Sequence, residues 1–337
     1  MAALRRIAWI GSPGKGGVAG MCHLFLCELG MLDLSLDVYS NRDVEEFPDL
    51  CGSFDGVSKR VLTFPYHWKW NSWYGRNRKT AFVMAFLKRL PVYGQIVERL
   101  LAEHQREPYD VVIQFSQGEL FKLGNYASEV PIILYPCVHA AGERFWCRME
   151  AQLARNCEPW WWRVLRDQYL GFRARAQKRD YIRAMGVIGM SHRFNKWVVR
   201  DYCVPEERLG VVHHPIEIPS ENSKVPGRPQ RTDQIRLLFV GRISVRKGVE
   251  MLVRAIPTLL ARYSDVEIGI IGAGSLWSDP SSTVQKVKIL VLNDLEKGKI
   301  ALALHFRAYL LIIYSSRNVG GSATPEARIA AEACAWS

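Results

Sequence analysis

The chain has 337 residues, of which 48% are hydrophobic and 23% charged, and its formal net charge at pH 7 is +12. This length and balance are typical of globular protein with a proper core, and they leave room for two domains of ordinary size. The positive charge favours anionic partners such as nucleotide phosphates, an acidic membrane surface or nucleic acid, and it does not choose among them.

The eight cysteines are scattered along the chain, and the closest two, Cys22 and Cys27, have four residues between them. No Cys-x-x-Cys pair occurs, so the pattern predicts neither a disulfide framework nor a zinc site. We therefore expect reduced thiols and a cytoplasmic protein. No apolar run reaches the roughly 18 residues that a membrane span needs. The segment 1–11 is too weakly apolar for a signal peptide and is typical of a buried strand.

Strands and helices alternate along the first part of the chain. The predicted strands are Arg6–Ile10, Leu36–Tyr39, Tyr109–Phe115, Val130–Cys137, Gly186–Met190 and Leu209–Val212. The predicted helices are Met21–Gly30, Thr80–Gln105, two within Gly142–Met185, and Phe194–Tyr202. Residues 41–77 are expected to be irregular and are rich in aromatic side chains. Such alternation indicates an α/β protein, with helices on both faces of a parallel sheet.

A proline-rich stretch interrupts the alternation. Four prolines, Pro215, Pro219, Pro226 and Pro229, fall within a short segment that also contains Ser and Asn. This composition is typical of an interdomain linker. We therefore expect a first domain over residues 1–218, a linker over 219–233 and a second domain over 234–337.

The second domain opens on the most informative stretch of the chain. A predicted strand from Ile235 ends at Gly241, Arg242 follows at once, and Lys247 precedes a helix. The apolar positions of that helix recur every three or four residues, which is the helical period. A loop of this kind lies at the carboxyl edge of the sheet, where open α/β folds bind ligands. Two cations beside a helix N-terminus suit a diphosphate, although a pair of solvated cations is the alternative.

A glycine-rich loop follows the first predicted strand and contains Gly14, Lys15, Gly16 and Gly17. It either lets the backbone approach a phosphate or sugar closely, or it is only a tight turn. A nucleotide-hydrolase P-loop is disfavoured, because Ala19-Gly20-Met21 stands where that motif needs Gly-Lys-Ser/Thr.

These segments, in this order, resemble the GT-B glycosyltransferases, and in particular the large retaining family four. The resemblance rests on Phe239-Val240-Gly241-Arg242 with Lys247-Gly248, on Ile270-Ile271-Gly272-Ala273-Gly274, on Gly16-Gly17-Val18, and on Val187-Ile188-Gly189-Met190-Ser191. It implies two Rossmann-like domains facing across a cleft, with a nucleotide-sugar donor held mainly by the second and the acceptor by the first. It also implies retention of configuration, no cofactor and no essential metal.

The resemblance also implies roles for individual residues. The resemblance implies that the donor diphosphate is bound by Arg242, Lys247, Gly16 and Gly17. It implies that the nucleoside is bound by Gly241, Gly272 and Glu332, and that Ser191 makes a polar contact in the cleft. Ser191 is alternatively the N-cap of the helix that follows it. His139, after the strand ending at Cys137, matches a family histidine that touches donor sugar or acceptor; a loop histidine bonded to backbone is the alternative. His213-His214-Pro215 departs from the family's usual segment and favours a structural role at the hinge.

The C-terminal glutamates depart from the family pattern. The family separates two glutamates by seven residues, whereas Glu326 and Glu332 have five between them. On a helix this difference turns a side chain by about 200°, so both carboxylates cannot keep the family geometry. Glu326 is the candidate contact to the donor sugar, and solvated helix charges are the alternative. The second domain is therefore expected to be truncated or divergent.

Aromatic residues are interleaved with cations in two places, around Trp68, Trp70 and Trp73 and at Trp160-Trp161-Trp162 with Arg163. This pattern suits a membrane interface or an extended acceptor, and a half-buried aromatic patch is the alternative. No recognised nucleic-acid-binding module accompanies the charge, so no nucleic-acid partner is expected.

The sequence therefore predicts a hexosyltransferase-type glycosyltransferase with a carbohydrate or lipid-linked acceptor. We expect it in the cytoplasm, with peripheral contact to an anionic membrane at its inner face. Two alternatives remain: a catalytically defective glycosyltransferase-like protein or fragment, and a basic membrane-surface binding protein.

Overall fold

A computed structural model describes residues 5–14, 17–41, 59–64, 78–116, 122–153, 159–215, 235–241, 245–263, 266–271, 300–305 and 310–315. The chain divides into two compact units. The first comprises Met1–Arg144 with Gln168–Pro219, and the second Phe145–Asp167 with Ser220–Ser337. The linker expected over residues 219–233 lies outside the described residues.

The first unit is built on a seven-stranded sheet in the order β3-β2-β1-β4-β5-β6-β7, and every neighbouring pair is parallel. The strands are β1 Arg6–Ile10, β2 Ser35–Ser40, β3 Lys59–Thr63, β4 Val111–Phe115, β5 Ile132–Tyr135, β6 Gly186–Gly189 and β7 Leu209–Val211. All five residues of β1 are buried, as expected where both faces of a parallel sheet are covered.

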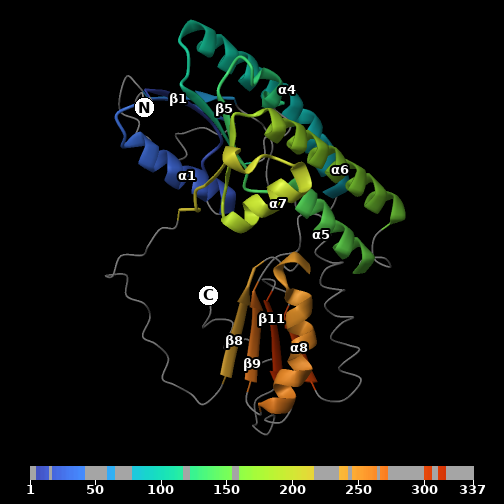
Figure 1. Ribbon diagram of the computed structural model, residues 1–337. Coiled ribbons are helices and arrows are strands. Elements are labelled where there is room, and N and C mark those ends of the chain that lie inside the picture. Colours follow the sequence, from blue (N-terminus) through green and yellow to red (C-terminus); the bar gives the residue numbers. More distant parts are fainter. Residues whose placement is uncertain are drawn as a thin grey trace. The chain divides into compact units, whose positions relative to one another are not determined.

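The helices of the first unit are α1 Gly17–Gly30, α4 Arg78–Arg106, α5 Ala140–Leu153, α6 Trp160–Arg183 and α7 His192–Tyr202, with 3-10 turns η2 Leu123–Tyr126 and η3 Glu206–Arg208. The end of α5, from Phe145, and the beginning of α6, up to Asp167, are grouped with the second unit. Figure 1 shows α1 on one side of the sheet and α4 and α6 on the other.

Alternate residues of β1 belong to two different cores. Ala8 and Ile10 pack in a cluster with residues of α4 and α7, whereas Ile7 and Trp9 pack in a cluster with Cys22 of α1. Because side chains of a strand alternate between its faces, one short apolar run supplies both layers.

Three elements of this unit differ from the expectation. The strand β3, with sequence Lys-Arg-Val-Leu-Thr, lies in the segment expected to be irregular. Helix α1 begins at Gly17, four residues earlier than expected, and α5 begins at Ala140. The charges of β3 and the glycines of α1 usually disfavour these elements, and they are tolerated because the neighbouring residues pack. The start of α5 differs from the expected one by two alanines, which favour a helix.

A buried ionic network joins three strands of the sheet to α4. Asp37 of β2 is 1% exposed and accepts hydrogen bonds from Arg6 at 3.1 Å, from Arg60 Nε at 2.7 Å and from Tyr109 at 2.6 Å. Arg60 also reaches Glu103 of α4 at 3.3 Å. Burial would raise the pKa of Asp37, but the hydrogen bonds from Arg60 and Tyr109 outweigh it and lower that pKa.

The edge strand β7 is tied to the end of α6 by one side chain. The guanidinium of Arg208, in η3, donates to the carbonyl oxygens of Tyr181 and Ile182, each at 2.9 Å, and to that of Ala184. An Arg at a helix C-terminus can donate to the last carbonyls and complements the helix dipole.

The second unit has a four-stranded sheet in the order β10-β11-β9-β8. Its elements are β8 Ile235–Val240, η4 Val245–Lys247, α8 Val249–Arg262, β9 Val266–Ile271, β10 Ile300–His305 and β11 Leu310–Ser315. β8 and β9 are parallel, joined by α8, which lies along the sheet in Figure 1. β11 is antiparallel to both β9 and β10, so this sheet is mixed where parallel pairing was expected. The four residues between β10 and β11 are too few for a crossover.

None of the helices in the described part of the chain combines the length and apolarity needed to cross a membrane.

Candidate functional site

The turn between β8 and α8 is the candidate donor site. Gly241 follows β8 with φ at +154°, and Gly248 precedes α8 with φ at +78°. Both values lie where side chains are disfavoured, so each end of the turn requires a glycine. Because β8 and β9 run parallel and in register from Ile235 to Val240, the turn lies at the carboxyl edge of the sheet, as the sequence predicted.

The beginning of α8 has the character of an anion site. Its N-cap is Gly248, which has no side chain to bond the first-turn amides, and those amides therefore stay available to a ligand. Lys247 lies in η4 directly before the helix, and its side chain is exposed. Its proposed partner Arg242 and the proposed nucleoside contact Gly272 lie outside the described residues.

The glycine-rich loop after β1 approaches its neighbours closely. A Cβ at Gly11 would lie 2.8 Å from Trp9 Nε1 and 3.2 Å from the Cβ of Phe115. Gly17 begins α1 with φ at +50°. The loop thus lies at the carboxyl edge of the first sheet, and Gly16 lies outside the described residues.

His139 is buried behind this edge. It is 5% exposed, and its Nε2 lies 2.7 Å from Oδ2 of Asp201 at the end of α7. The ring packs against Tyr202 and Trp197, with centroids 4.8 and 6.4 Å away. Burial lowers the pKa of His139, and Asp201 opposes that shift without cancelling it. The contact with Asp201 ties the start of α5 to α7, which is a structural role; contact with substrate stays a prediction.

Ser191 caps α7. Its backbone is extended, and its Oγ accepts a hydrogen bond from the N–H of Phe194 at 3.1 Å. This is the N-cap geometry that the sequence offered as one of two readings. Contact between Ser191 and a ligand stays a prediction.

The two hinge histidines hold the segment after β7 against the sheet. His213 Nδ1 lies 3.1 Å from the carbonyl oxygen of Met190, and the His214 ring lies 6.2 Å from that of Tyr135. Tyr135 in turn donates to the carbonyl oxygen of Val212 at 2.8 Å. Burial, and then the charge of His213, lower the pKa of His214. These contacts join the carboxyl ends of β5, β6 and β7.

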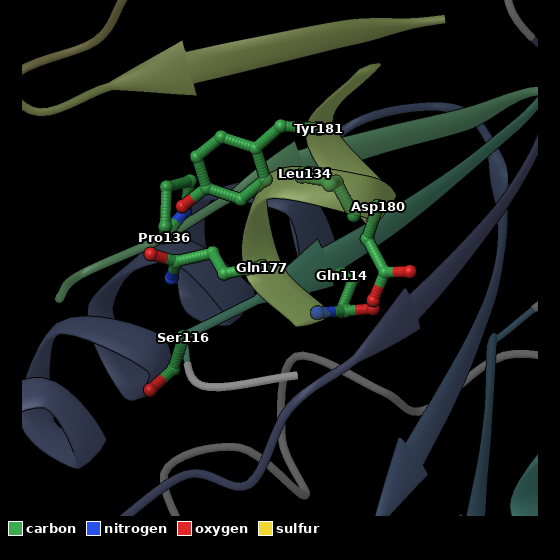
Figure 2. A pocket seen from close by; sticks show the side chains of 7 residues that line it. All are labelled: Gln114, Ser116, Leu134, Pro136, Gln177, Asp180 and Tyr181. Atoms are coloured by element: carbon green, nitrogen blue, oxygen red, sulfur yellow. The ribbon is translucent and has the colours of Figure 1, made fainter. Parts of the chain in front are cut away.

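Sequence reasoning missed a small cavity at the carboxyl ends of β4 and β5, under α6. Figure 2 shows the side chains that line it: Gln114, Ser116, Leu134, Pro136, Gln177, Asp180 and Tyr181. Its volume of about 10 Å³, measured for the centre of a water-sized sphere, suits about one water and no sugar. Ser116 has φ at +73°, which is uncommon outside glycine. Side chains from β4, β5 and α6 meet here, and no local sequence signal predicts this.

The remaining predicted residues, Glu326, Glu332 and the tryptophans at 68, 70 and 73, lie outside the described residues. Within the described ranges, no group of three or more His, Cys, Asp or Glu side chains is arranged to hold a metal ion.

No family model and no curated protein matches the chain. Solved structures do. A sucrose-phosphate synthase of Thermosynechococcus elongatus aligns over 87% of this chain and 69% of its own, with a TM-score of 0.50 and 14% identity. HepE of Anabaena, in complex with UDP and glucose, aligns over 86% of this chain with a TM-score of 0.49 and 15% identity. UGT2 of Phytolacca americana aligns over 70% of this chain with a TM-score of 0.43 and 14% identity.

The chain spans 66% of the length of HepE, slightly under two thirds. The likeness to the synthase, together with the parallel α/β architecture, shows that the chain has the GT-B fold. At this low sequence identity, the structural similarity is evidence for the fold only.

Proposed function

We propose that the chain is a glycosyltransferase that moves a sugar from a nucleoside diphosphate to an acceptor. The observation that carries the proposal is the strand–turn–helix from β8 to α8. It places two positive-φ glycines, uncapped helix amides and an exposed Lys247 at one edge of a sheet. Such an edge is where open α/β folds take their ligands, and helix amides and a cation both favour a phosphate.

The leaving group in this reaction is a nucleoside diphosphate, whose growing negative charge must be neutralised. Lys247 and Arg242 would do so without a metal, since Lys and Arg can both stabilise developing phosphate charge. Gly16 and Gly17 would let backbone approach the diphosphate, while Gly241, Gly272 and Glu332 would contact the nucleoside. His139 and Glu326 are the candidate contacts to the reacting sugar.

The finer parts of the proposal follow from the resemblance to family four. They are hexosyl transfer with retention of configuration, no cofactor and no essential metal, and a carbohydrate or lipid-linked acceptor bound by the first unit. They also include a cytoplasmic location with contact to an anionic membrane. If no metal is required, transfer continues after chelation with EDTA; complete loss, restored by a divalent ion, would contradict that part.

The test is thermal unfolding of the full chain with UDP, GDP, ADP and their sugar conjugates. A nucleotide at 100 times its dissociation constant should stabilise the fold by about 2.7 kcal/mol. Lys247→Ala and Arg242→Ala should abolish the shift. Arg262→Ala is the matched control, because it removes the same charge from the opposite, exposed end of α8.

No shift with any nucleotide, in a chain shown to be folded, would overturn the donor site. Nucleotide binding without transfer to any acceptor would instead favour the catalytically defective alternative.

A further inference from the structure

Helix α6 has an exposed face that is apolar and aromatic in its first half. Trp160 is 70% exposed, Trp161 47% and Phe172 44%, and Val164 and Leu165 are exposed between them. From Trp161 to Phe172 these positions recur at helical spacing, so they share one side of the helix. The opposite side packs inward through Leu170, which is fully buried. We call the exposed set, from Trp160 to Phe172, the aromatic face.

The same side of α6 becomes basic in its second half. Arg175 and Arg179 follow Phe172 by three and seven residues, which keeps them on the side of the aromatic face, and Arg175 is exposed. The helix carries six Arg and one Lys against two Asp. Two of these Arg, Arg166 and Arg173, are buried, so the surplus positive charge outside is carried by the others.

Helix α5 continues the apolar character. Two ion pairs hold it antiparallel to α6, Glu143 with Arg173 at 2.8 Å and Arg148 with Asp167 at 2.6 Å. Phe145 and Met149, one turn apart on α5, are 57% and 39% exposed. Single exposed apolar side chains are common on protein surfaces, but a group of large ones on two adjacent helices indicates a surface that binds a membrane or another protein.

We propose that the aromatic face of α6 docks on an anionic lipid bilayer. Trp side chains prefer the boundary between headgroups and acyl chains, and flanking Arg side chains reach the anionic headgroups. A second copy of the chain fits this surface less well, because a two-fold contact sets a patch against itself and would oppose the surplus cations of both helices. The proposal rests on the membrane contact that the proposed function includes, and it assigns that contact to one surface. It uses no residue of the donor site, so failure of vesicle binding and failure of nucleotide binding are separate results.

The test measures binding of the full chain to sedimented vesicles of phosphatidylcholine alone and of phosphatidylcholine mixed with phosphatidylglycerol. Binding is expected only to the anionic vesicles, and it should weaken as salt is raised. The double variant Trp160→Ser/Trp161→Ser should reduce binding about tenfold or more, since two large apolar side chains no longer enter the interface. Arg175→Gln should reduce it about fivefold, the effect of one cation near such a surface.

The matched control is Met31→Ser/Met251→Ser, which removes two side chains that are 79% and 76% exposed elsewhere. It should bind like the unmodified chain. All of the substituted side chains are exposed, so the thermal midpoints should stay close together.

Three outcomes would overturn the proposal: no binding to anionic vesicles, binding that the tryptophan variant retains in full, or binding that salt leaves unchanged. Light scattering adds a fourth, because a dimer that only the tryptophan variant loses would make a second copy the occupant.

Discussion

At Gly189 the backbone of β6 leaves no room for a side chain. A Cβ there would lie 1.8 Å from Oδ1 and 2.8 Å from Cγ of Asn195. Asn195, at the start of α7, donates through Nδ2 to the carbonyl oxygen of Gly210 in β7 at 2.9 Å. A single amide thus fixes the distance between two strands and a helix, and it does so because glycine stands opposite.

Gly189→Ala should therefore destabilise the chain by about 1–3 kcal/mol, the usual cost of inserting a methyl group into a packed interior. Urea unfolding measures the difference. Gly94→Ala is the control, because nothing lies within 4 Å of its Cβ position in α4, and there alanine should stabilise the helix by up to about 1 kcal/mol. Equal stability of Gly189→Ala and the unmodified chain would contradict the close approach.

The burial of His139 has a consequence for pH dependence. Its pKa in the folded chain lies below its usual 6.5, so between the two values the unfolded chain binds more protons. Stability is then highest above about pH 6.5 and falls as the solution is made more acidic. Imidazole titration by NMR should give a lower midpoint for His139 than in the urea-unfolded chain.

Asp201→Asn should lower that midpoint further, because the Asp201 carboxylate raises the pKa of His139. A midpoint that rises in Asp201→Asn, or a folded value above the unfolded one, would refute this account of the pair.

At the scale of elements, ion pairs of one residue of β2 hold this strand to both of its neighbours. Asp37 bridges Arg6 of β1 and Arg60 of β3 while buried at 1% exposure. Asp37→Asn removes the carboxylate that these two guanidinium groups share and leaves them Glu103, at 3.8 Å from Arg6 and 3.3 Å from Arg60. Removing one member of a buried pair costs about 3–5 kcal/mol. The control Asp167→Asn acts on the more exposed pair with Arg148, where about 0–1 kcal/mol is expected. Chemical denaturation compares them, and equal losses would contradict the structural weight of the network.

The alternation of strands and helices could be read from the sequence because each buried strand of the first sheet is a short apolar run between polar loops. β3 was not predicted because it begins with Lys59 and Arg60. Arg60 is paired there with Asp37, 23 residues earlier, and with Glu103 of α4. The strands β10 and β11 were not predicted either. β11 pairs antiparallel with both β10 and β9, and the direction of pairing is not a local property of the sequence.

The features of the candidate site also fall into two groups: local ones that the sequence predicts, and contacts between distant residues that it does not. The turn from Gly241 to Gly248 and the cap at Ser191 are local features, so residue type and spacing could predict where they lie. The partner of His139 is Asp201, 62 residues away, and the cavity below α6 gathers side chains from three elements. Contacts of this kind depend on the order of the strands in the sheet, which the sequence pattern does not predict.

For the whole molecule, the proposed function predicts a local response to nucleotide. Hydrogen exchange should slow at the amides between Gly241 and the first turn of α8, where a phosphate would accept their hydrogen bonds. The amides of β3, at the far edge of the first sheet, should exchange at an unchanged rate. Lys247→Ala should remove the protection and Arg262→Ala should keep it. Uniform slowing over both units would contradict binding at this turn.

The contacts of Arg208 have a consequence for the synthesis of the first unit. From β4 onward, each new strand joins the edge of the sheet in the order in which the ribosome releases it. The carbonyls at the end of α6 differ, because the guanidinium that donates to them belongs to a residue 24 to 27 positions later in the chain. Until η3 emerges, a nascent chain therefore carries an unfinished helix end, and the first unit is closed by one of the last pieces to be translated within it.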